Sequence, residues 1–327
     1  MPLFVALVLI GGFSYGQTAH DASRWELAWE DDFDTFDENR WLKVDYARHG
    51  DELQVYMQSA VSVAEGNLVI TADETPTYCP PNPPTVWGVC TPCENKTYSY
   101  VSGWVETKAA YMVHYGLIEA RIKVPYGSGF WTAFWTFKGQ NIKGSNVAEI
   151  DIFEMLGHRP SDIITTNIHT DYKNELNHYQ EYRMGNYSND FHDYALEWTP
   201  YEMVWYVDGD PIRVLRNHDI VDPVRLILNF AIDPTYPPDF TTFFPAEMLV
   251  DYVKVYRHKG PYEVPKNGFE IVFGKRKTKK NKAKSAIAQF VPAGRDLALR
   301  ASRQLLIDGY VSIPIGASCG VNVDVCN

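Results

Sequence analysis

Long apolar runs are scarce in this sequence of 327 residues. The run from Leu3 to Phe13 is shorter than the roughly 20 residues that a membrane helix needs, and it ends in Ser14-Tyr15-Gly16. No later run is longer or more apolar. The pattern predicts a cleaved secretion signal over residues 1–16 and an exported, extracellular or cell-surface protein without a membrane span, although no basic residue precedes the run. A buried N-terminal strand is the alternative.

Cysteine is scarce as well, with five residues in the chain. Cys79, Cys90 and Cys93 lie in one Pro-rich loop, and Cys319 and Cys326 lie near the C-terminus. Such spacing favours disulfide bonds in an oxidising compartment, and the odd count leaves one thiol unpaired. A zinc site is the alternative, but Cys90 and Cys93 have no second cysteine pair or nearby histidine pair to complete it.

Long amphipathic helical patterns are missing before residue 260. Short runs separated by Gly, Pro, Asn and Asp alternate between apolar and polar residues instead, as in GLIEARIKV, GNLVITA, MLVDYVKVY and EMVWYVDGDPIRV with its Asp-Gly turn. The 45% hydrophobic and 14% aromatic residues suffice for one large core. We therefore expect an all-β protein, an antiparallel sandwich of two sheets with a small C-terminal appendage.

Charge divides the chain near Gly260. Residues 260–327 carry 11 Lys and Arg against 5 Asp and Glu, whereas residues 1–259 carry 19 against 36. We expect a main domain at residues 17–259, a basic linker at 260–285 and a small β module at 286–327, although DLALRASRQLL in that module also fits a helix. The lysines of KRKTKKNKAK have no aromatic residues between them, so a nucleic-acid partner is not expected.

The segment AEIDIFEMLG, from Ala148 to Gly157, places Glu149, Asp151 and Glu154 in an otherwise apolar strand. Simple alternation would put Glu149 and Asp151 on one face and Glu154 on the other, toward the core. One extra residue in a β-bulge between Asp151 and Glu154 would bring all three to one face. Because buried ionised carboxylates are costly, we predict that bulge.

Three aligned carboxylates suit glycoside hydrolysis by the retaining route. One carboxylate attacks the anomeric carbon and a second protonates the leaving oxygen, which requires the two about 5 to 5.5 Å apart. The middle acid, Asp151, can set the charge of Glu149, because neighbouring carboxylates push each other's pKa values apart.

The acidic pattern Glu-x-Asp-x-x-Glu, with its flanks, resembles glycoside hydrolase family 16. The segments ELQVY, GNLVITA, SGWVETK, YGLIEARIKVP, GSGFWTAFW, FHDYALEWTP, WYVDG and VDYVKVY stand in that family's order between Trp25 and Tyr256. The resemblance implies a concanavalin-like jelly-roll sandwich with an open cleft. It also implies Glu149 as nucleophile, Asp151 as assisting acid and Glu154 as general acid/base, with no cofactor for catalysis.

Aromatic residues near the acidic strand are candidates for stacking against sugar rings. By alternation Trp131 and Trp135 share a face, so we assign both to the cleft in preference to the core. Trp104, where family members often have Arg, fits either place. His169 either binds a sugar hydroxyl or is structural. Trp198 and Trp205 are expected in the core.

Asp251 shares its predicted strand face with apolar residues. A hydrogen-bonded aspartate is the simpler reading, and the alternative, which the resemblance supports, is a structural calcium site with Glu30 as a second ligand.

Three functions remain open. The first is an endo-hydrolase of β-1,3-glucan, also accepting mixed-linkage glucan; the second is a hydrolase of algal galactans such as agar, porphyran or carrageenan. The third is a non-catalytic glucan-binding protein, although this chain keeps all three acids. In each case we expect a monomer whose partner is a polysaccharide.

Overall fold

The computed structural model describes residues 23–262 except 84–88, 139–147, 171–178, 184, 189 and 218–219, together with short strands between Ile271 and Val321. The predicted secretion signal at residues 1–16 lies outside these described residues. In the described part of the chain, no helix is long and apolar enough to cross a membrane.

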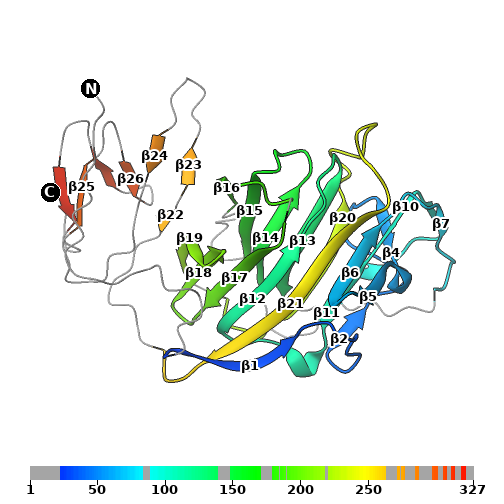
Figure 1. The fold of residues 1–327 in the computed structure, drawn as a ribbon, viewed down its shortest axis with the longest axis horizontal. Coiled ribbons are helices and arrows are strands. Elements are labelled where there is room, and N and C mark those ends of the chain that lie inside the picture. Colours follow the sequence, from blue (N-terminus) through cyan, green and yellow to red (C-terminus); the bar gives the residue numbers. More distant parts are fainter. Residues whose placement is uncertain are drawn as a thin grey trace.

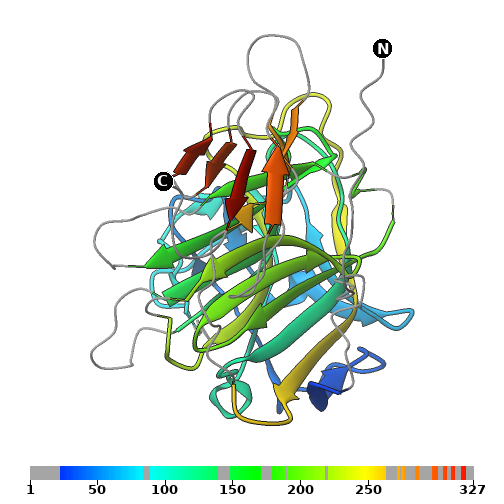
Figure 2. The ribbon, with the colours of Figure 1, turned by 90° about the vertical axis from the view of Figure 1, so that its left-hand side faces the viewer.

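Two large antiparallel sheets form the body of the molecule, confirming the predicted sandwich (Figure 1; Figure 2). The first sheet has nine strands. In spatial order these are β22 (Ile271–Val272), β19 (Asp210–Arg216), β18 (Glu202–Val207), β17 (His192–Trp198), β12 (Gly116–Lys123), β21 (Ala246–His258), β6 (Asn67–Ala72) and β5 (Val61–Ala64), with β1 (Trp25–Asp31) also paired to β21.

The second sheet has seven strands and carries the acidic segment. Its order is β16 (Gln180–Arg183), β15 (Ile163–Thr170), β14 (Ala148–Leu156), β13 (Phe130–Phe137), β20 (Arg225–Ile232), β11 (Trp104–Thr107) and β2 (Trp41–Lys43). Neighbouring strands in this sheet are often distant in sequence. The sheet therefore depends on long-range pairing, as a jelly roll requires.

The predicted Asp-Gly turn joins β18 to β19. Asp208 and Gly209 have φ angles of 50° and 80°, and they are the only two residues between the strands. Positive φ at both central positions matches the twist of a two-residue hairpin, which explains the choice of these residue types.

The main core lies between the two large sheets. Trp198 and Trp205 are fully buried there, as predicted, and the ring of Phe153 stacks on Tyr194 with centroids 4.1 Å apart. Aromatic rings of this size bury much apolar surface, so packing against the core side of the seven-stranded sheet fixes the position of the acidic strand.

A smaller sheet and a hairpin-like pair lie in the segment from Ala47 to Ser102. The sheet contains β10 (Tyr100–Ser102), β4 (Gln54–Tyr56), β3 (Ala47–Arg48) and β8 (Thr91–Pro92), and the pair is β7 (Thr77–Tyr78) with β9 (Thr97–Tyr98). Two short 3-10 helices span Gln58–Ala60 and Ala109–Tyr111.

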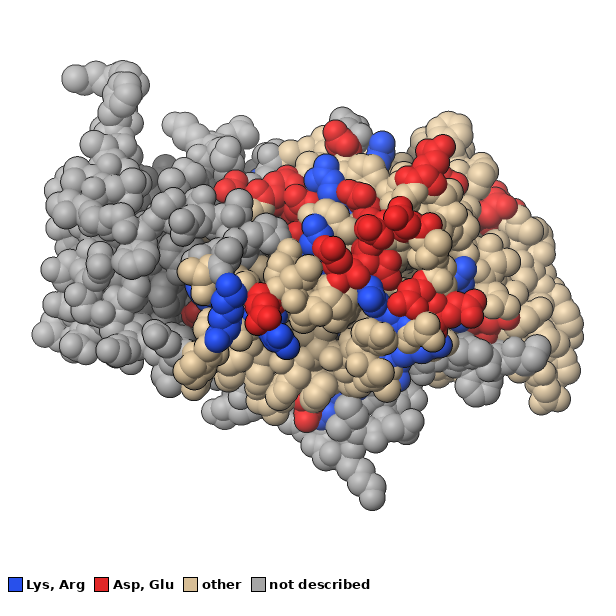
Figure 3. Space-filling model, turned by 60° about the horizontal axis from the view of Figure 1, so that its bottom comes forward, with Lys and Arg blue, Asp and Glu red and all other residues tan. Residues whose placement is uncertain are grey.

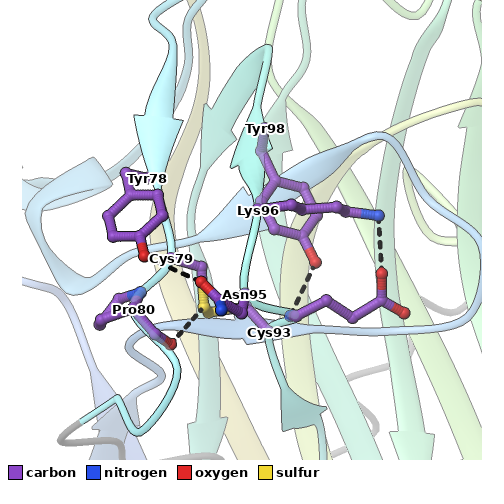
Figure 4. The surroundings of a disulfide bond; sticks show 8 residues. Tyr78, Cys79, Pro80, Cys93, Asn95, Lys96 and Tyr98 are labelled. Carbon is purple, nitrogen blue, oxygen red and sulfur yellow. Dashed lines mark hydrogen bonds and ion pairs between the residues drawn. A yellow bond between two sulfur atoms is a disulfide. The ribbon is translucent and has the colours of Figure 1, made fainter.

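The Pro-rich loop contains one disulfide bond, between Cys79 and Cys93 (Figure 4). Cys90 is a buried free thiol. The predicted disulfide is therefore confirmed for this loop, and because the sulfur of Cys93 is bonded to Cys79, Cys90 and Cys93 do not form the zinc-binding pair of the alternative.

Short strand pairs occupy the region after residue 262. They are β23 (Gly274–Arg276) with β24 (Lys284–Ala286), β25 (Leu297–Arg300) with β28 (Ser318–Val321), and β26 (Leu305–Ile307) with β27 (Val311–Ile313). The stretch DLALRASRQLL contributes strands β25 and β26, so the strand alternative applies and the helix alternative does not. Strands β22 and β23 fall within the predicted linker, and β22 pairs with β19 of the main sheet.

Candidate active site

The acidic strand β14 contains the predicted bulge. Asp151 pairs with Asn167 and Glu154 with Thr165, so three steps along β14 match two along β15. Ile152 and Phe153 both pack into the main core. The extra residue therefore restores Glu154 to the face that carries Glu149 and Asp151. We call this outer face of the seven-stranded sheet the acid face.

His169 lies beside two of the three acids. It pairs with Glu149 across the strands, and its Nε2 is 3.3 Å from Glu149 Oε1 and 3.3 Å from Asp151 Oδ2. Asn167 Nδ2 lies 3.0 Å from the same nitrogen. From the sequence we predicted a sugar-binding or structural role for His169, whereas the structure places it in contact with the catalytic candidates themselves.

Glu154 is held by neutral donors. Trp131 Nε1 donates to Glu154 Oε1 at 2.8 Å, and Thr165 Oγ1 donates to Glu154 Oε2 at 3.3 Å. Each carboxylate oxygen therefore has its own donor, which fixes the orientation of the side chain.

Burial and neighbouring charges change the pKa values of Glu149, Glu154 and His169. Burial, reinforced by the charge of Asp151, raises the pKa of Glu149 and of Glu154 to about 8. The hydrogen bond to Asp151 raises the pKa of His169 to about 9. A protonated His169 lowers the pKa of both glutamates, and the two donors to Glu154 stabilise its carboxylate. Because the two raised pKa values belong to one interacting cluster, the glutamates share protons near neutral pH, as a pair made of one acid and one nucleophile requires.

The three tryptophans considered for the cleft differ in exposure. Trp131 is half-buried on the acid face. Trp135 shares that face, since it lies opposite Asp151, but it is only 6% exposed. Its assignment as a sugar-stacking ring is wrong, because other side chains cover it. Trp104 is fully buried, which removes the same assignment and selects its core alternative.

Metal binding has two candidate positions. Among the described residues, one group of at least three possible ligands lies close together, namely Glu149, Asp151 and His169, with ligand atoms within 4.8 Å of one another. The hydrogen bond to Asp151 raises the pKa of His169 to about 9, so a metal at this group would have to displace a proton from the ring near neutral pH. We interpret the group as a hydrogen-bonded acid cluster.

The predicted calcium ligands Asp251 and Glu30 lie on β21 and β1. Asp251 Oδ2 is 3.4 Å from Arg121 Nε, in agreement with the simpler reading of a paired aspartate. Its side chain is 47% exposed, and it lies at a register shift between β12 and β21, which explains a charge in this apolar strand. The calcium site stays a prediction.

Several side chains around the acids were missed in the sequence. Thr165 and Asn167 alternate with His169 along β15, and this period of two was the available signal. His49 and Glu52 come from the distant segment before β4, and no local pattern in the sequence indicated that they approach the acid face.

Comparison with known proteins agrees with this geometry. Residues 50–233 match the family model of glycosyl hydrolases family 16. The chain is 32% identical to a beta-glucanase of Rhodothermus marinus over 289 residues, covering 78% of this chain and 93% of that protein. It is 29% identical to glucan endo-1,3-beta-glucosidase A1 of Niallia circulans over 71% of this chain, but it spans only 38% of that longer protein.

A solved structure shows the same fold. The catalytic domain of an endo-1,3-beta-glucanase (laminarinase) from Thermotoga petrophila superimposes with a TM-score of 0.63 at 30% identity, covering 72% of this chain and 99% of that domain. The bulged acidic strand, its position in the seven-stranded sheet and these similarities lead to one conclusion: the chain belongs to glycosyl hydrolase family 16 and is a glycoside hydrolase.

Proposed function

We propose that the protein hydrolyses internal β-1,3 bonds of glucans, including mixed-linkage glucans, with retention of anomeric configuration. The observation that carries this proposal is the bulge at Ile152, which aligns Glu149, Asp151 and Glu154 on one face. The glucan preference is supported by the similar beta-glucanases and laminarinase.

In the proposed reaction, the ionised Glu149 attacks the anomeric carbon while Glu154 gives its proton to the glycosidic oxygen. The bond between that oxygen and the anomeric carbon breaks, and a glycosyl ester of Glu149 forms. Glu154, now a carboxylate, then takes a proton from water as the water oxygen attacks the same carbon and releases Glu149. Two inversions at one carbon give net retention.

Asp151 and His169 act as positioning residues in this scheme. Asp151 accepts a hydrogen bond from His169, which also lies 3.3 Å from Glu149. The imidazolium thereby balances part of the negative charge on Glu149 before the ester forms. When the ester forms and Glu149 becomes neutral, Asp151 still holds His169 in place.

Surface charge supports a neutral substrate. Residues 1–259 carry 36 acidic against 19 basic residues, and Figure 3 shows a face on which acidic side chains gather among fewer basic ones. A polymer bearing many sulfates would be repelled at long range by such a surface. Sulfated galactans are therefore disfavoured as substrates.

The test is a substrate panel of laminarin, lichenan, agarose and carrageenan, with product analysis and the Glu149→Gln and Glu154→Gln variants as controls. We expect oligosaccharides from laminarin, and from lichenan at a lower rate. Each variant should lose about 10²-fold or more in kcat while retaining its fold by circular dichroism. Cleavage of agarose or carrageenan alone would support the galactan alternative, and laminarin binding without hydrolysis would support the binding-protein alternative.

We also propose that residues 1–16 are removed on export, and that residues 17–259 form a monomeric catalytic domain, followed by a linker to residue 285 and a C-terminal β module. The short apolar run and the charge boundary at residue 260 support this division. A truncated protein ending at residue 262 should hydrolyse soluble laminarin at the rate of the full chain. An inactive truncated protein would show that the following strands, including β22, belong to the catalytic domain.

A further inference from the structure

Residues paired across the seven-stranded sheet define two rows on the acid face. Because directly opposed residues in antiparallel strands point to the same side, each row continues the face of one catalytic acid. One row contains Thr165, Glu154, Ala133, Asn229 and Trp104, and the other contains Asn167, Asp151, Trp135, Ile227 and Glu106.

Exposure on the acid face is concentrated around Glu154. Of the two rows only Glu154 is partly exposed, and His169 and Trp131, which lie beside the rows, are partly exposed as well, whereas Asp151, Thr165 and Asn167 are buried. At the β11 end of the rows Trp104 and Glu106 are fully buried. These buried residues point away from the main core, so a second layer must cover them.

A second hydrophobic cluster supplies that layer. We call its five members outside the seven-stranded sheet the cover cluster, which consists of Val44, Ala47, Tyr56, Val89 and Cys90. The cluster packs directly on Trp104, Trp135 and Ile227. The ring of His49 adds to it, with its centroid 5.3 Å from that of Trp104 and 5.7 Å from that of Trp135.

Polar contacts hold the cover cluster on the sheet. The backbone N–H of Val89 donates to Glu106 Oε2 at 3.0 Å, and Asn229 Nδ2 donates to the hydroxyl of Tyr56 at 3.0 Å. The disulfide between Cys79 and Cys93 closes the loop that contains Cys90 (Figure 4). Together with the buried apolar surface, these bonds make the cover a fixed part of the fold.

Two half-buried polar side chains lie in the segment that leads into the cover. His49 contacts the rings of Trp104 and Trp135. The carboxyl of Glu52 accepts hydrogen bonds from the Tyr56 hydroxyl at 2.7 Å and from Gln54 Nε2 at 2.6 Å. The Tyr56 hydroxyl in turn accepts a hydrogen bond from Asn229, whose side-chain oxygen accepts one from Trp135 Nε1. Trp135 lies opposite Asp151 in the sheet. Glu52 is thus linked by three hydrogen bonds to the residue beside the catalytic acids.

We propose that the substrate-binding surface is one-sided: it ends at the cover cluster over β20 and β11, where His49 and Glu52 contact the last sugar bound on that side. This inference rests on the proposed function and goes beyond it. A sugar chain can contact the partly exposed side chains of Trp131, Glu154 and His169 on the acid face, but a longer chain must turn away from the sheet at the cover. Sugars added beyond that point have no protein surface to bind.

The first test maps the bound sugars. β-1,3-gluco-oligosaccharides from trisaccharide to octasaccharide, carrying a heavy-oxygen label at the reducing end, are cleaved by the full-length enzyme, and each cleaved bond is located by mass spectrometry. We expect the main cleavage to stay at a fixed short distance from one chain end as the chain grows. Extension at that end should change kcat/KM by less than about twofold. Each sugar added at the other end stacks on or hydrogen-bonds to the sheet and should therefore raise kcat/KM. Cleavage positions that spread toward both ends, with gains from extension at both, would overturn the proposal.

Substitutions test the two side chains that bound the site. His49→Ala and Glu52→Gln should each raise KM for the shortest cleaved oligosaccharide by about 5- to 10-fold, the loss expected for one hydrogen bond, with a much smaller change in kcat. Tyr78→Ala, at an exposed ring near the disulfide, is the matched control and should change neither. A fall in melting temperature without a change in KM would show a purely structural role for His49 and Glu52.

A third measurement needs no substrate and separates this inference from the proposed function. Cys90 is a member of the cover cluster and is 5% exposed, so its thiol should resist alkylation in the native protein and react after unfolding, as read by peptide mass mapping. Rapid native labelling of Cys90 would show that the cover opens, and the one-sided site would then be withdrawn even if laminarin is hydrolysed. Protection of Cys90 without hydrolysis of any β-1,3 substrate would instead refute the proposed function alone.

Discussion

Trp205 on β18 donates its indole N–H to the backbone oxygen of Asp151 on β14, with an N···O distance of 3.0 Å. The bond crosses from one sheet to the other at the residue where the bulge begins. A bulge removes a strand residue from regular pairing, and a buried donor from the facing sheet stabilises the displaced backbone. Trp205 therefore ties the main core to the geometry of the acids.

Trp205→Phe should weaken both stability and catalysis. The ring still fills the core, but the buried Asp151 oxygen loses this donor, which costs about 1–3 kcal/mol. We expect a lower free energy of unfolding in urea and a lower kcat on laminarin. Trp198→Phe is the matched control, since Trp198 is also fully buried and donates to the backbone oxygen of Ile220. It should lose stability and keep kcat, and an equal loss of kcat in both variants would contradict the link between Trp205 and the acids.

Trp131→Phe should shift the alkaline limb of the kcat/KM profile to higher pH. The hydrogen bond from Trp131 lowers the pKa of Glu154 by stabilising its carboxylate, so its removal raises that pKa and keeps the acid protonated further into the alkaline range. Thr165→Val removes the second donor and should produce a smaller shift in the same direction. An unchanged or acid-shifted limb would separate Glu154 from the general-acid role.

His169→Gln should move the acid limb of the same profile to higher pH. The charge of His169 lowers the pKa of Glu149, and a neutral glutamine no longer does so, so Glu149 ionises only at higher pH. The rate at the acid end of the range should fall while the alkaline end changes less. Because the groups are coupled, each limb belongs to the cluster and not to one residue. A uniform loss of rate at every pH would instead indicate a structural role for His169.

Replacing either glutamate should stabilise the protein at alkaline pH. The pKa of each is raised from 4.5 to about 8 in the folded state. Each therefore contributes stability that is fully present below pH 4.5 and is lost as the pH rises through about 8. In Glu149→Gln and Glu154→Gln this loss is removed, so the free energy of unfolding should decline less than in the wild type across that interval. Urea unfolding at both ends of the interval measures the difference, and a steeper decline in the variants would contradict the raised pKa values.

The sequence predicted the features that depend on local pattern. Alternation in GLIEARIKV and the Asp-Gly turn indicated strands β12, β18 and β19, and the position of Glu154 in an apolar strand required the bulge that the structure contains. Each of these follows from the direction in which neighbouring side chains point along one strand.

The layer above the acid face could not be predicted in this way. Alternation places Trp135 on the face of the acids. It does not show that His49 and the cover cluster fold over this ring, because some of these residues precede Trp135 by more than 80 positions in the sequence. Burial of Trp104 and Trp135 depends on packing between segments distant in sequence, for which the sequence has no periodic signal. The assignment of Trp135 to sugar binding was wrong for that reason, and of the two alternatives left open for Trp104 the buried one applies.

The most direct test of the account is the configuration of the first product released from a β-1,3-glucan, followed by proton NMR before the anomers equilibrate. The alignment of Glu149 and Glu154 on one face predicts attack by Glu149 and therefore retention, so the β-anomer should appear first and the α-anomer should grow only by mutarotation. If the α-anomer appears first, water has attacked the anomeric carbon directly, and the roles proposed for both glutamates are wrong.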